Sequence, residues 1–582
     1  MSGIAGVFHA DGRPADPDLV GRMAVALAHR GPDGEACWVS GSVGLAHRRL
    51  ASATAEDKLP LTDSQGRAVV VDGRLDEPLE TFRRRGVEFV EGALGEFAVA
   101  VWDAPTRTLV CARDAFGVKP LYVHWDGRRL LFASEVGALF QDPSVLRRPD
   151  PATIADYLMM DFRDPGATFF DGIRRVPPGH VLTVGTRGLS LRRSWTPDGA
   201  TRGGSPDDHA REVAARFHAA VSDRLAAASA AGVLLSGGID STLVAAAAGV
   251  VRGRDRSIAA LTYLHDGFLV EDWEAIAALA GAGAIAPPRM RAGLPLLDML
   301  LASAEPPNDE GHPVLQPLLD PGAAPEFRVL LTGVGGDQLS SAAERGALGD
   351  RLASARIVAA WREAGALVNA YGGSGRRATA EVLWSALPPR LRRTARALAG
   401  RDAPAWLVPR LARSRRSAPD DAPRFETRMG AAIWRALTAP ALAFALEKLD
   451  AEAAPLGIEP RHPYLDRRVV EGVLAVPPEV FVRHGYRKQF VQRALGGGVL
   501  PLRTIERPAE HVPFPDPAAA LRDEAERIDH ELFRHDARIF EYVDRPRAER
   551  MRDDYLAGRG RHGARLWSFL LLEAWLRRTF PS

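Results

Sequence analysis

The chain has 582 residues, of which 46% are hydrophobic and 25% charged, and its formal net charge is +2. This length favours two or more domains, and the composition is that of an ordinary soluble globular protein. The near-balance of 75 basic and 73 acidic side chains gives no general reason to expect nucleic-acid binding. Only two cysteines occur, Cys37 and Cys111, which excludes a disulfide scaffold and fits a reducing compartment.

Export and membrane insertion have no signal in the sequence. Residues 1–9 contain no basic region and no long apolar core, so they do not resemble a secretory signal. The longest apolar runs, such as Leu243–Val251, are too short to span a bilayer. We therefore expect a cytoplasmic protein that binds neither a membrane nor nucleic acid.

The first part of the chain has the pattern of a β-rich domain. Short apolar or alternating segments are separated by Gly, Asp and Pro turns, which indicates strands. A Gly-, Pro- and Ser-containing segment, Thr196–Pro206, has the composition of a linker. We expect a domain at 1–200 and a second at 201–582. The strands expected in the first are Val69–Val71, Phe97–Trp102, Thr108–Ala112, Leu121–His124 and Leu130–Ala133.

After the linker the pattern changes to helices alternating with strands, which predicts a parallel α/β sheet. From about residue 341 onward, Ala, Leu and Arg recur with helical periodicity, and no internal repeat is visible. The expected helices lie near 207–230, 241–250 and 272–282, and the expected strands are Gly232–Leu235, Ile258–Tyr263 and Val329–Thr332.

A glycine-rich loop lies between the first of these strands and the helix that follows it. The motif Ser236–Ser241 reads Ser-Gly-Gly-Ile-Asp-Ser. Its two glycines let the backbone approach a ligand, and the first N–H groups of the helix then point at an anion. The Asp240 carboxylate would repel phosphates unless a Mg²⁺ ion lay between them. The alternative is a glycine-rich turn in which Asp240 caps the helix.

A second loop repeats this design after the strand at Val329–Thr332. Gly333–Asp337 again combines glycines with one carboxylate, at the sheet edge where ligands bind in such folds. We expect Asp240 and Asp337 to be the Mg²⁺ ligands, with a turn-forming Asp337 as the alternative. The residues expected to bind ATP and pyrophosphate are Leu235, Ser236, Gly237, Gly238, Asp240, Ser241, Thr262, Gly335 and Gly336.

The Ser236–Ser241 loop resembles the pyrophosphate loop of N-type ATP pyrophosphatases, which split ATP between its α- and β-phosphates. With further motifs in order, nearly the whole chain resembles the glutamine-dependent asparagine synthetases. The resemblance implies an Ntn-hydrolase-like αββα sandwich, then an adenine-nucleotide α-hydrolase-like domain with a parallel sheet and helical additions, and ATP and Mg²⁺ as cofactors. The further motifs are Ser2–Gly6, His29–Gly34, Ala112–Tyr122, Phe132–Glu135, Pro177–His180 and Glu459–Asp466.

The glutaminase half departs from that family at its nucleophile. Ser2 stands where the family has a cysteine, and a hydroxyl needs more help from a base than a thiolate does. Val71–Leu75 replaces the Gly-Glu-Ile-Tyr-Asn strand that lines the glutamine site, and much of the following segment is missing. We expect an inactive glutaminase-like domain retained as a scaffold. The alternative is that Ser2 acts as the nucleophile, as serine does in other N-terminal hydrolases.

The synthetase half departs as well. Gly333–Gln338 lacks two of the family's carboxylates, and Ala509 stands where the family places a lysine. Adenylation needs cations around the forming pyrophosphate, and Arg507 and Lys488 both remain open as their source. We expect Lys488, Arg507 and Asp466 to be catalytic.

The source of the amine separates three related groups of enzymes. Asparagine synthetases need ammonia, whereas β-lactam synthetases and lasso peptide cyclases take the amine from the substrate. Gly333–Gln338 and Pro404–Pro409 look like the lasso cyclases, while β-lactam synthetases carry a tyrosine where Val334 stands. We expect a lasso peptide cyclase with a precursor peptide, a leader peptidase and a leader-binding protein as partners. The alternatives are a small-molecule amide synthetase and a non-catalytic binding protein on the same fold.

Two further features have two interpretations each. The arginines within residues 389–416 form either a solvated helical face or a docking surface for an acidic peptide or a partner protein. Trp406 is either a core aromatic residue or part of the grip on a peptide.

Overall fold

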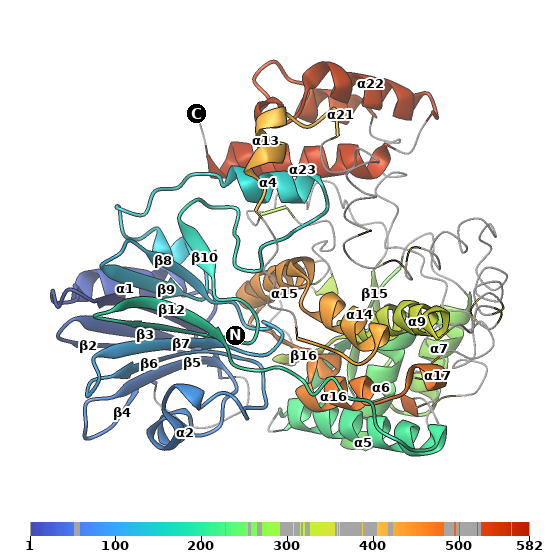
Figure 1. Ribbon diagram of the computed structural model, residues 1–582, viewed down its shortest axis with the longest axis horizontal. Helices are drawn as coiled ribbons and strands as arrows, with labels where there is room; N and C mark the ends of the chain where they lie inside the picture. Colours follow the sequence, from blue (N-terminus) through green and yellow to red (C-terminus); the bar gives the residue numbers. More distant parts are fainter. Residues whose placement is uncertain are drawn as a thin grey trace.

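The structure is a computed structural model in which the first domain, the parallel-sheet domain and a C-terminal group of helices lie around a shared boundary (Figure 1). It describes residues 2–51, 59–226, 228–253, 258–264, 270–291, 326–354, 404–416, 423–481, 525–559 and 562–580, together with 306–307, 315, 318–319, 358, 360, 362, 384, 387, 391, 490, 494–495, 500 and 521.

The first domain contains two six-stranded antiparallel sheets. In spatial order the first sheet consists of β10 (Ile173–Arg175), β8 (Tyr122–Trp125), β9 (Arg129–Ala133), β1 (Gly3–His9), β3 (Val43–Arg49) and β2 (Gly34–Ser40). The second consists of β12 (Gly188–Arg193), β11 (His180–Gly185), β7 (Thr108–Arg113), β6 (Phe97–Asp103), β5 (Ala68–Gly73) and β4 (Leu61–Thr62).

The two sheets face each other across one hydrophobic core, and helices cover their outer faces. Ile4 and Phe8 of β1 pack in this core with Val70 of β5 and Ala100 of β6. Because both faces are covered, β6 is buried along its whole length and reads as an uninterrupted apolar run. This arrangement confirms the αββα sandwich. The outer helices are α1 (Pro17–Ala26), α3 (Val136–Leu139) and α4 (Pro151–Leu158) on one side, and α2 (Pro78–Arg85) with η1 (Gly86–Glu88) on the other.

The second domain begins with a strongly capped helix. Helix α5 (Pro206–Leu225) has Ser205 as its N-cap in a capping box with Asp208, and its proline occupies the first turn. It ends before the expected residue 230, since Ala226 already leaves helical geometry. That early end leaves room for the connection to the first strand of the parallel sheet.

The parallel sheet has five strands. Its order is β15 (Arg289–Arg291), β14 (Ala259–Tyr263), β13 (Ala231–Leu234), β16 (Val329–Leu331) and β17 (Glu459–Arg461). Of these strands, β13, β14 and β16 were expected and β15 and β17 were not. The helical prediction for the region after residue 341 is therefore wrong at β17. A three-residue strand with a central proline and two charged side chains has no strand signal, and its pairing with β16 alone defines it.

Helices cover this sheet and link it to the first domain. Those nearest the sheet are α6 (Ile239–Arg252), α7 (Val270–Gly281), α9 (Gly336–Ala353), α14 (Arg428–Leu437), α15 (Pro440–Ala453), η3 (Ala454–Leu456), η4 (Pro463–Leu465), α16 (Arg467–Leu474) and α17 (Pro478–Phe481). The stretch Arg428–Leu456 is long and apolar enough to cross a membrane, but half of it is buried inside the protein. It comprises α14, α15 and η3, which contribute to the hydrophobic cores, so it is weak evidence for a membrane span.

The C-terminal helices pack on α4 of the first domain (Figure 1). Arg415 and Arg416 follow the first of them and form ion pairs with Asp156 and Asp150, at 2.6 Å each. For these two arginines both earlier interpretations are wrong, because they hold two parts of the chain together. Arg390, Arg392, Arg393 and Arg396 lie outside the described residues. The helices are α13 (Pro409–Ser414), α21 (Ala525–Leu532), η5 (Arg538–Glu541), α22 (Arg545–Leu556) and α23 (Gly563–Thr579).

Trp406 lies in the same C-terminal region and packs within it. Its ring centroid is 5.5 Å from that of Phe569, and the Arg565 guanidinium lies 4.6 Å from it. These contacts match the core-aromatic interpretation of Trp406.

Candidate active site

The Ser236–Ser241 loop lies at the carboxyl end of β13 and leads into α6. Gly237 has a φ of +77°, a backbone conformation that side chains other than glycine's disfavour. The Ser241 hydroxyl lies 3.1 Å from the Ser236 hydroxyl and 3.0 Å from the Gly238 carbonyl oxygen. Gly238 is the N-cap of α6 and no side chain caps the helix, so the capping alternative for Asp240 is wrong. The loop presents hydroxyls and a helix N-terminus, which is a site for an anion.

The second glycine loop packs directly on the first. A Cβ added at Gly333 would lie 2.8 Å from the Ser241 nitrogen, and one at Gly336 would lie 2.5 Å from the Asp240 Cγ. Glycines are therefore required for this close approach. Asp337 lies in the first turn of α9, where it accepts a hydrogen bond from the Ser341 hydroxyl at 3.2 Å. It is not a turn-forming residue.

Asp240 and Asp337 occupy the same place on two helices. Each is the second residue of its helix, α6 or α9, and both helices begin at the same edge of the sheet. The Tyr464 hydroxyl donates a hydrogen bond to the Asp240 carbonyl oxygen at 3.3 Å. Burial, followed by the negative charges of Asp240 and Asp337, holds the pKa of Tyr464 well above its usual value. Both carboxylates are thus within electrostatic reach of one side chain.

The donor set fits Mg²⁺ bound together with phosphate. Mg²⁺ is usually held by one or two carboxylates, waters and substrate phosphates rather than by a cage of protein ligands. Within the described part of the chain, no group of three or more His, Cys, Asp and Glu side chains could hold a metal. Asp240 and Asp337 beside a phosphate-binding helix terminus supply the two carboxylates that such an ion needs.

Thr262 lies on β14, the strand next to β13. Its side chain is fully buried, and its hydroxyl has no hydrogen-bond partner among the residues that the structure describes. Buried hydroxyls are normally paired, so this one is available to a ligand at the sheet edge. Leu235 continues the same edge, since its backbone nitrogen donates to the Leu261 carbonyl oxygen at 2.8 Å. The role of Thr262 in nucleotide binding stays a prediction.

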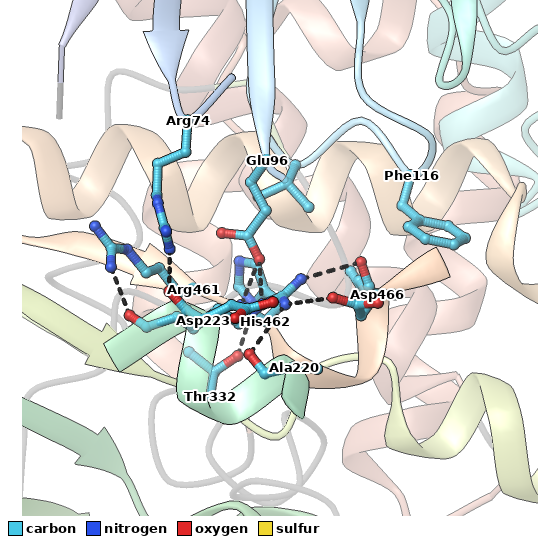
Figure 2. Close-up of polar contacts among 12 residues, drawn as sticks. Arg74, Glu96, Phe116, Ala220, Asp223, Thr332, Arg461, His462 and Asp466 are labelled. Carbon is cyan, nitrogen blue, oxygen red and sulfur yellow. Dashed lines mark hydrogen bonds and ion pairs between the residues drawn. The ribbon is translucent and has the colours of Figure 1, made fainter. Parts of the chain in front are cut away.

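A buried polar network connects the first domain to this site (Figure 2). The Glu96 carboxylate lies at the start of β6 and accepts hydrogen bonds from Arg224 Nε and the His462 backbone nitrogen, at 2.9 Å each. His462 Nδ1 is 2.6 Å from the Thr332 hydroxyl, which accepts a hydrogen bond from the Val334 nitrogen at 3.3 Å. The network thus extends from β6 to the loop that carries Asp337.

Asp466 belongs to this network. Its side chain caps α16 through the Arg468 nitrogen and pairs with Arg224 at 2.9 Å. Burial alone would raise its pKa, but hydrogen bonds from Arg468 and the charge of Arg224 lower the pKa to about 2. The structure gives Asp466 a role in holding the domains together, and its catalytic role stays a prediction. Lys488, Arg507 and Ala509 lie outside the described residues.

In the first domain, Ser2 forms hydrogen bonds with other groups of the protein. The Ser2 hydroxyl accepts a hydrogen bond from the Leu50 nitrogen at 3.4 Å, and the Ser2 carbonyl oxygen accepts one from Arg30 Nε at 3.0 Å. The same guanidinium pairs with Asp72 at 3.0 Å and with Asp450 of the second domain at 2.7 Å. The Ser2 backbone is thus bonded to a group that already binds buried carboxylates.

Asp72 shares the Arg30 guanidinium with the Ser2 backbone. It is fully buried in β5, within the Val71–Leu75 segment that departs from the related enzymes. Burial raises its pKa, although the Arg30 charge opposes this. Amide hydrolysis develops negative charge on the substrate oxygen and requires hydrogen-bond donors there. A buried carboxylate one guanidinium away from Ser2 works against that charge.

Comparison with known proteins agrees with both halves of the fold. A glutamine amidotransferase domain model matches residues 1–75 and 78–195, and an asparagine synthase model matches residues 212–286 and 293–577. The chain belongs to the asparagine synthase family. Members of this family form amide bonds and use ATP, typically with Mg²⁺.

Three relatives show how far the likeness extends. Asparagine synthetase [glutamine-hydrolyzing] 3 of Bacillus subtilis (strain 168) is 30% identical over 255 residues, which are 39% of this chain and 42% of the relative. A putative asparagine synthetase [glutamine-hydrolyzing] of Mycobacterium tuberculosis (strain ATCC 25618 / H37Rv) is 28% identical over 393 residues, 58% of each chain. Amidase chry2 of Gibberella zeae is 31% identical over 254 residues, 38% of this chain and 37% of the relative. Each match spans less than two thirds of the relative.

Several residues of the site were not recognised from the sequence. Glu96, Arg224, Thr332 and His462 were not assigned any role, and Tyr464 was noted only within the Glu459–Asp466 motif. That motif carried the one available signal, because it combines five polar or aromatic side chains in eight residues. The partners of these side chains are set by the position of β17 beside β16. The sequence did not predict this short strand.

Proposed function

We propose that this protein is an ATP-dependent amide ligase that forms AMP and pyrophosphate and receives the amine from its own substrate. The observation that carries this proposal is the pair Asp240 and Asp337 on the first turns of α6 and α9, beside the Ser236–Ser241 loop. The loop hydroxyls and helix N–H groups bind the β- and γ-phosphates. Asp240 and Asp337 would hold a Mg²⁺ ion, which would supply positive charge to the leaving pyrophosphate.

In this reaction a substrate carboxylate attacks the α-phosphorus of ATP, the α–β bond breaks and pyrophosphate leaves. An amine then attacks the resulting acyl-adenylate, with loss of AMP and a proton, to give an amide. ATP labelled at the α-phosphate, incubated with Mg²⁺ and substrate, should yield AMP. Formation of ADP and phosphate would contradict the proposed cleavage.

The proposal that the amine comes from the substrate rests on the first domain. Ser2 replaces the expected thiol, and the Arg30 guanidinium that binds the Ser2 backbone is paired with the buried Asp72 carboxylate. The protein then has no ammonia source of its own. A substrate that carries both a carboxylate and an amine removes the need for one, because holding both ends makes the reaction effectively unimolecular, an advantage of roughly 7–11 kcal/mol.

We infer that the substrate is a precursor peptide whose Asp or Glu side chain is joined to its N-terminal amine, as in lasso peptide cyclases. The support is the absent ammonia source together with the resemblance of Gly333–Gln338 to that group. A leader peptidase would expose the amine, and a leader-binding protein would deliver the peptide.

Mass spectrometry tests this inference. The candidate precursor is incubated with its leader peptidase, this protein, ATP and Mg²⁺. Loss of one water with a protease-resistant product supports the cyclase. The names of the relatives favour a second candidate, a small-molecule amide synthetase. Product from aspartate plus ammonia, or dehydration of a small β-amino acid, would establish that candidate and exclude the peptide.

A further inference from the structure

A separate cavity of about 340 Å³ lies between the first domain, α15 and the end of α23. Its lining includes the aromatic side chains of Phe169, Phe170 and Phe444 and the cationic side chains of Arg147 and Arg175. Small-molecule sites usually occupy roughly 300–1,000 Å³. The cavity contains no residue of either glycine loop, so it is distinct from the nucleotide site.

Arg175 is the side chain that indicates a ligand. It is only 2% exposed, and its guanidinium lies 3.8 Å from the centroid of the Phe444 ring. Nη2 pairs with Glu447 at 2.9 Å, whereas Nε and Nη1 have no hydrogen-bond partner among the described residues. Buried donors on a charged group are costly unless they are paired. An acceptor is therefore missing at this wall of the cavity.

The neighbouring carboxylates do not supply that acceptor. Glu447 also binds Arg113, at 2.9 Å, so one carboxylate serves two guanidinium groups and one positive charge is left over. Glu135, which also lines the cavity, is bound by Arg30 at 3.0 Å and His29 at 2.9 Å.

Arg147 adds a cation at the exposed side of the cavity, whose lining also includes Arg30, Lys448 and Arg578. It is exposed, stacks on the Phe140 ring at 4.6 Å and forms no ion pair within the described residues. Tyr122 and Phe140 add two further aromatic side chains to the lining, and Arg175 itself lies against the Phe444 ring. The cavity thus combines basic side chains with an aromatic surface, and its two carboxylates, Glu135 and Glu447, are already bound to arginines.

We propose that this cavity binds an aromatic carboxylate. The carboxylate accepts hydrogen bonds from the N–H groups that Arg175 leaves unused, and the ring packs against Phe169, Phe170 and Phe444. Arg147 attracts the anion at the exposed side. The same chemistry is presented by a free aromatic acid and by a peptide that ends in an aromatic residue.

Isothermal titration of the full chain without ATP tests this proposal independently of amide synthesis. We expect 3-phenylpropionate to bind at one site and 3-phenylpropanamide to bind at least about tenfold more weakly, since hydrogen bonds to charged groups are the stronger ones. N-acetyl-L-phenylalanine provides the third arm. Tighter binding of it than of 3-phenylpropionate assigns the site to a peptide C-terminus, and weaker binding assigns it to a free acid.

Variants connect the binding to the cavity. Arg175→Met should abolish binding, and Arg147→Gln should weaken it about two- to fivefold, as expected for an exposed charge. Arg148→Gln is the matched control, because Arg148 is also exposed and does not line the cavity. The Arg175→Met variant can fail to fold. The proposal is therefore also tested by Arg147→Gln and by comparing 3-phenylpropionate with 3-phenylpropanamide, neither of which depends on that variant. Equal binding of acid and amide, no saturable binding of the acid, or unchanged binding by Arg147→Gln would overturn the proposal.

Discussion

The two domains each contain a site that the related enzymes use, and the two sites differ in what surrounds them. In the second domain, glycines bring two helix N-termini and two carboxylates together at a sheet edge. In the first domain, Ser2 lies beside an Arg30–Asp72 ion pair that is completely buried. The first arrangement leaves donors for a ligand, whereas the second uses its charges within the protein.

The first domain also supplies buried charges to its boundary with the second domain. Arg30 pairs with Asp450, and Glu96 pairs with Arg224, so buried charges of each domain are neutralised by the other. Removing the first domain would leave those charges exposed or unpaired in the second. The network also reaches Thr332, next to the loop that carries Asp337. The first domain thus contributes to holding the second in shape.

The largest expected effect is on the nucleotide site. Asp240→Asn and Asp337→Asn should each lower the rate of AMP formation by about 10²–10³, because each removes a charge that stabilises the transition state. Asp207→Asn is the matched control, since Asp207 is also the second residue of its helix, α5, but is exposed and far from the glycine loops in sequence. An unchanged rate of AMP formation in Asp337→Asn would show that this carboxylate does not serve the nucleotide site.

Next in size is the effect on the domain boundary. Glu96→Gln should lower the free energy of unfolding by about 3 kcal/mol, because it removes one partner of a buried ion pair and leaves Arg224 with Asp466 alone. Denaturant unfolding measures this change. Glu80→Gln is the control, since its partner Arg83 is half exposed and its effect should stay below about 0.5 kcal/mol. Equal effects of the two substitutions would show that the boundary adds no stability.

Acid should weaken the fold through two buried histidines. Burial lowers the pKa of His462 to about 4, and burial with the Arg49 charge lowers that of His47 to about 4. Between pH 6.5 and 5 the unfolded chain therefore binds protons that the folded chain does not. Stability should fall on acidification by about 2 kcal/mol per histidine over that interval. His462→Asn should remove about half of this pH dependence, and an unchanged slope would contradict the assignment.

Ser2 should give the smallest effect. Ser2→Ala should leave AMP formation unchanged, because the hydroxyl only accepts one weak hydrogen bond from Leu50. Ser2→Cys should not produce glutamine hydrolysis, since Asp72 and the altered Val71–Leu75 segment remain. Release of glutamate by Ser2→Cys at the rate of a cysteine-dependent relative would show that only the nucleophile had been lost.

Local patterns in the sequence predicted the elements and loops that are defined by neighbouring residues. Gly237 and Gly238 between an apolar strand and a helix indicated the phosphate loop, and the repeat of that design indicated where Asp337 would lie. The strand β6 was expected because an apolar run bounded by turns is typical of a buried strand. Each of these patterns is contained in a stretch of about ten consecutive residues, so the sequence alone shows it.

Features that depend on distant pairing could not be predicted in this way. The strand β17 exists because Glu459–Arg461 lies beside β16, and nothing within it indicates a strand. The partners of Glu96 are 128 and 366 residues away in the chain, and those of Arg415 and Arg416 more than 250 residues away. A charged residue in a sequence is compatible with a solvated face or a buried pair, and only the packing distinguishes them.

The central claim is that one of the two sites functions and the other does not, and a single preparation of the full chain can test both. Binding of MgATP is measured by titration, and glutamate release from glutamine is measured in the same sample. We predict saturable binding of MgATP that is lost in Asp337→Asn, with no glutamate formed above a Ser2→Ala control. Glutamate release that depends on Ser2, or MgATP binding that survives Asp337→Asn, would contradict the account.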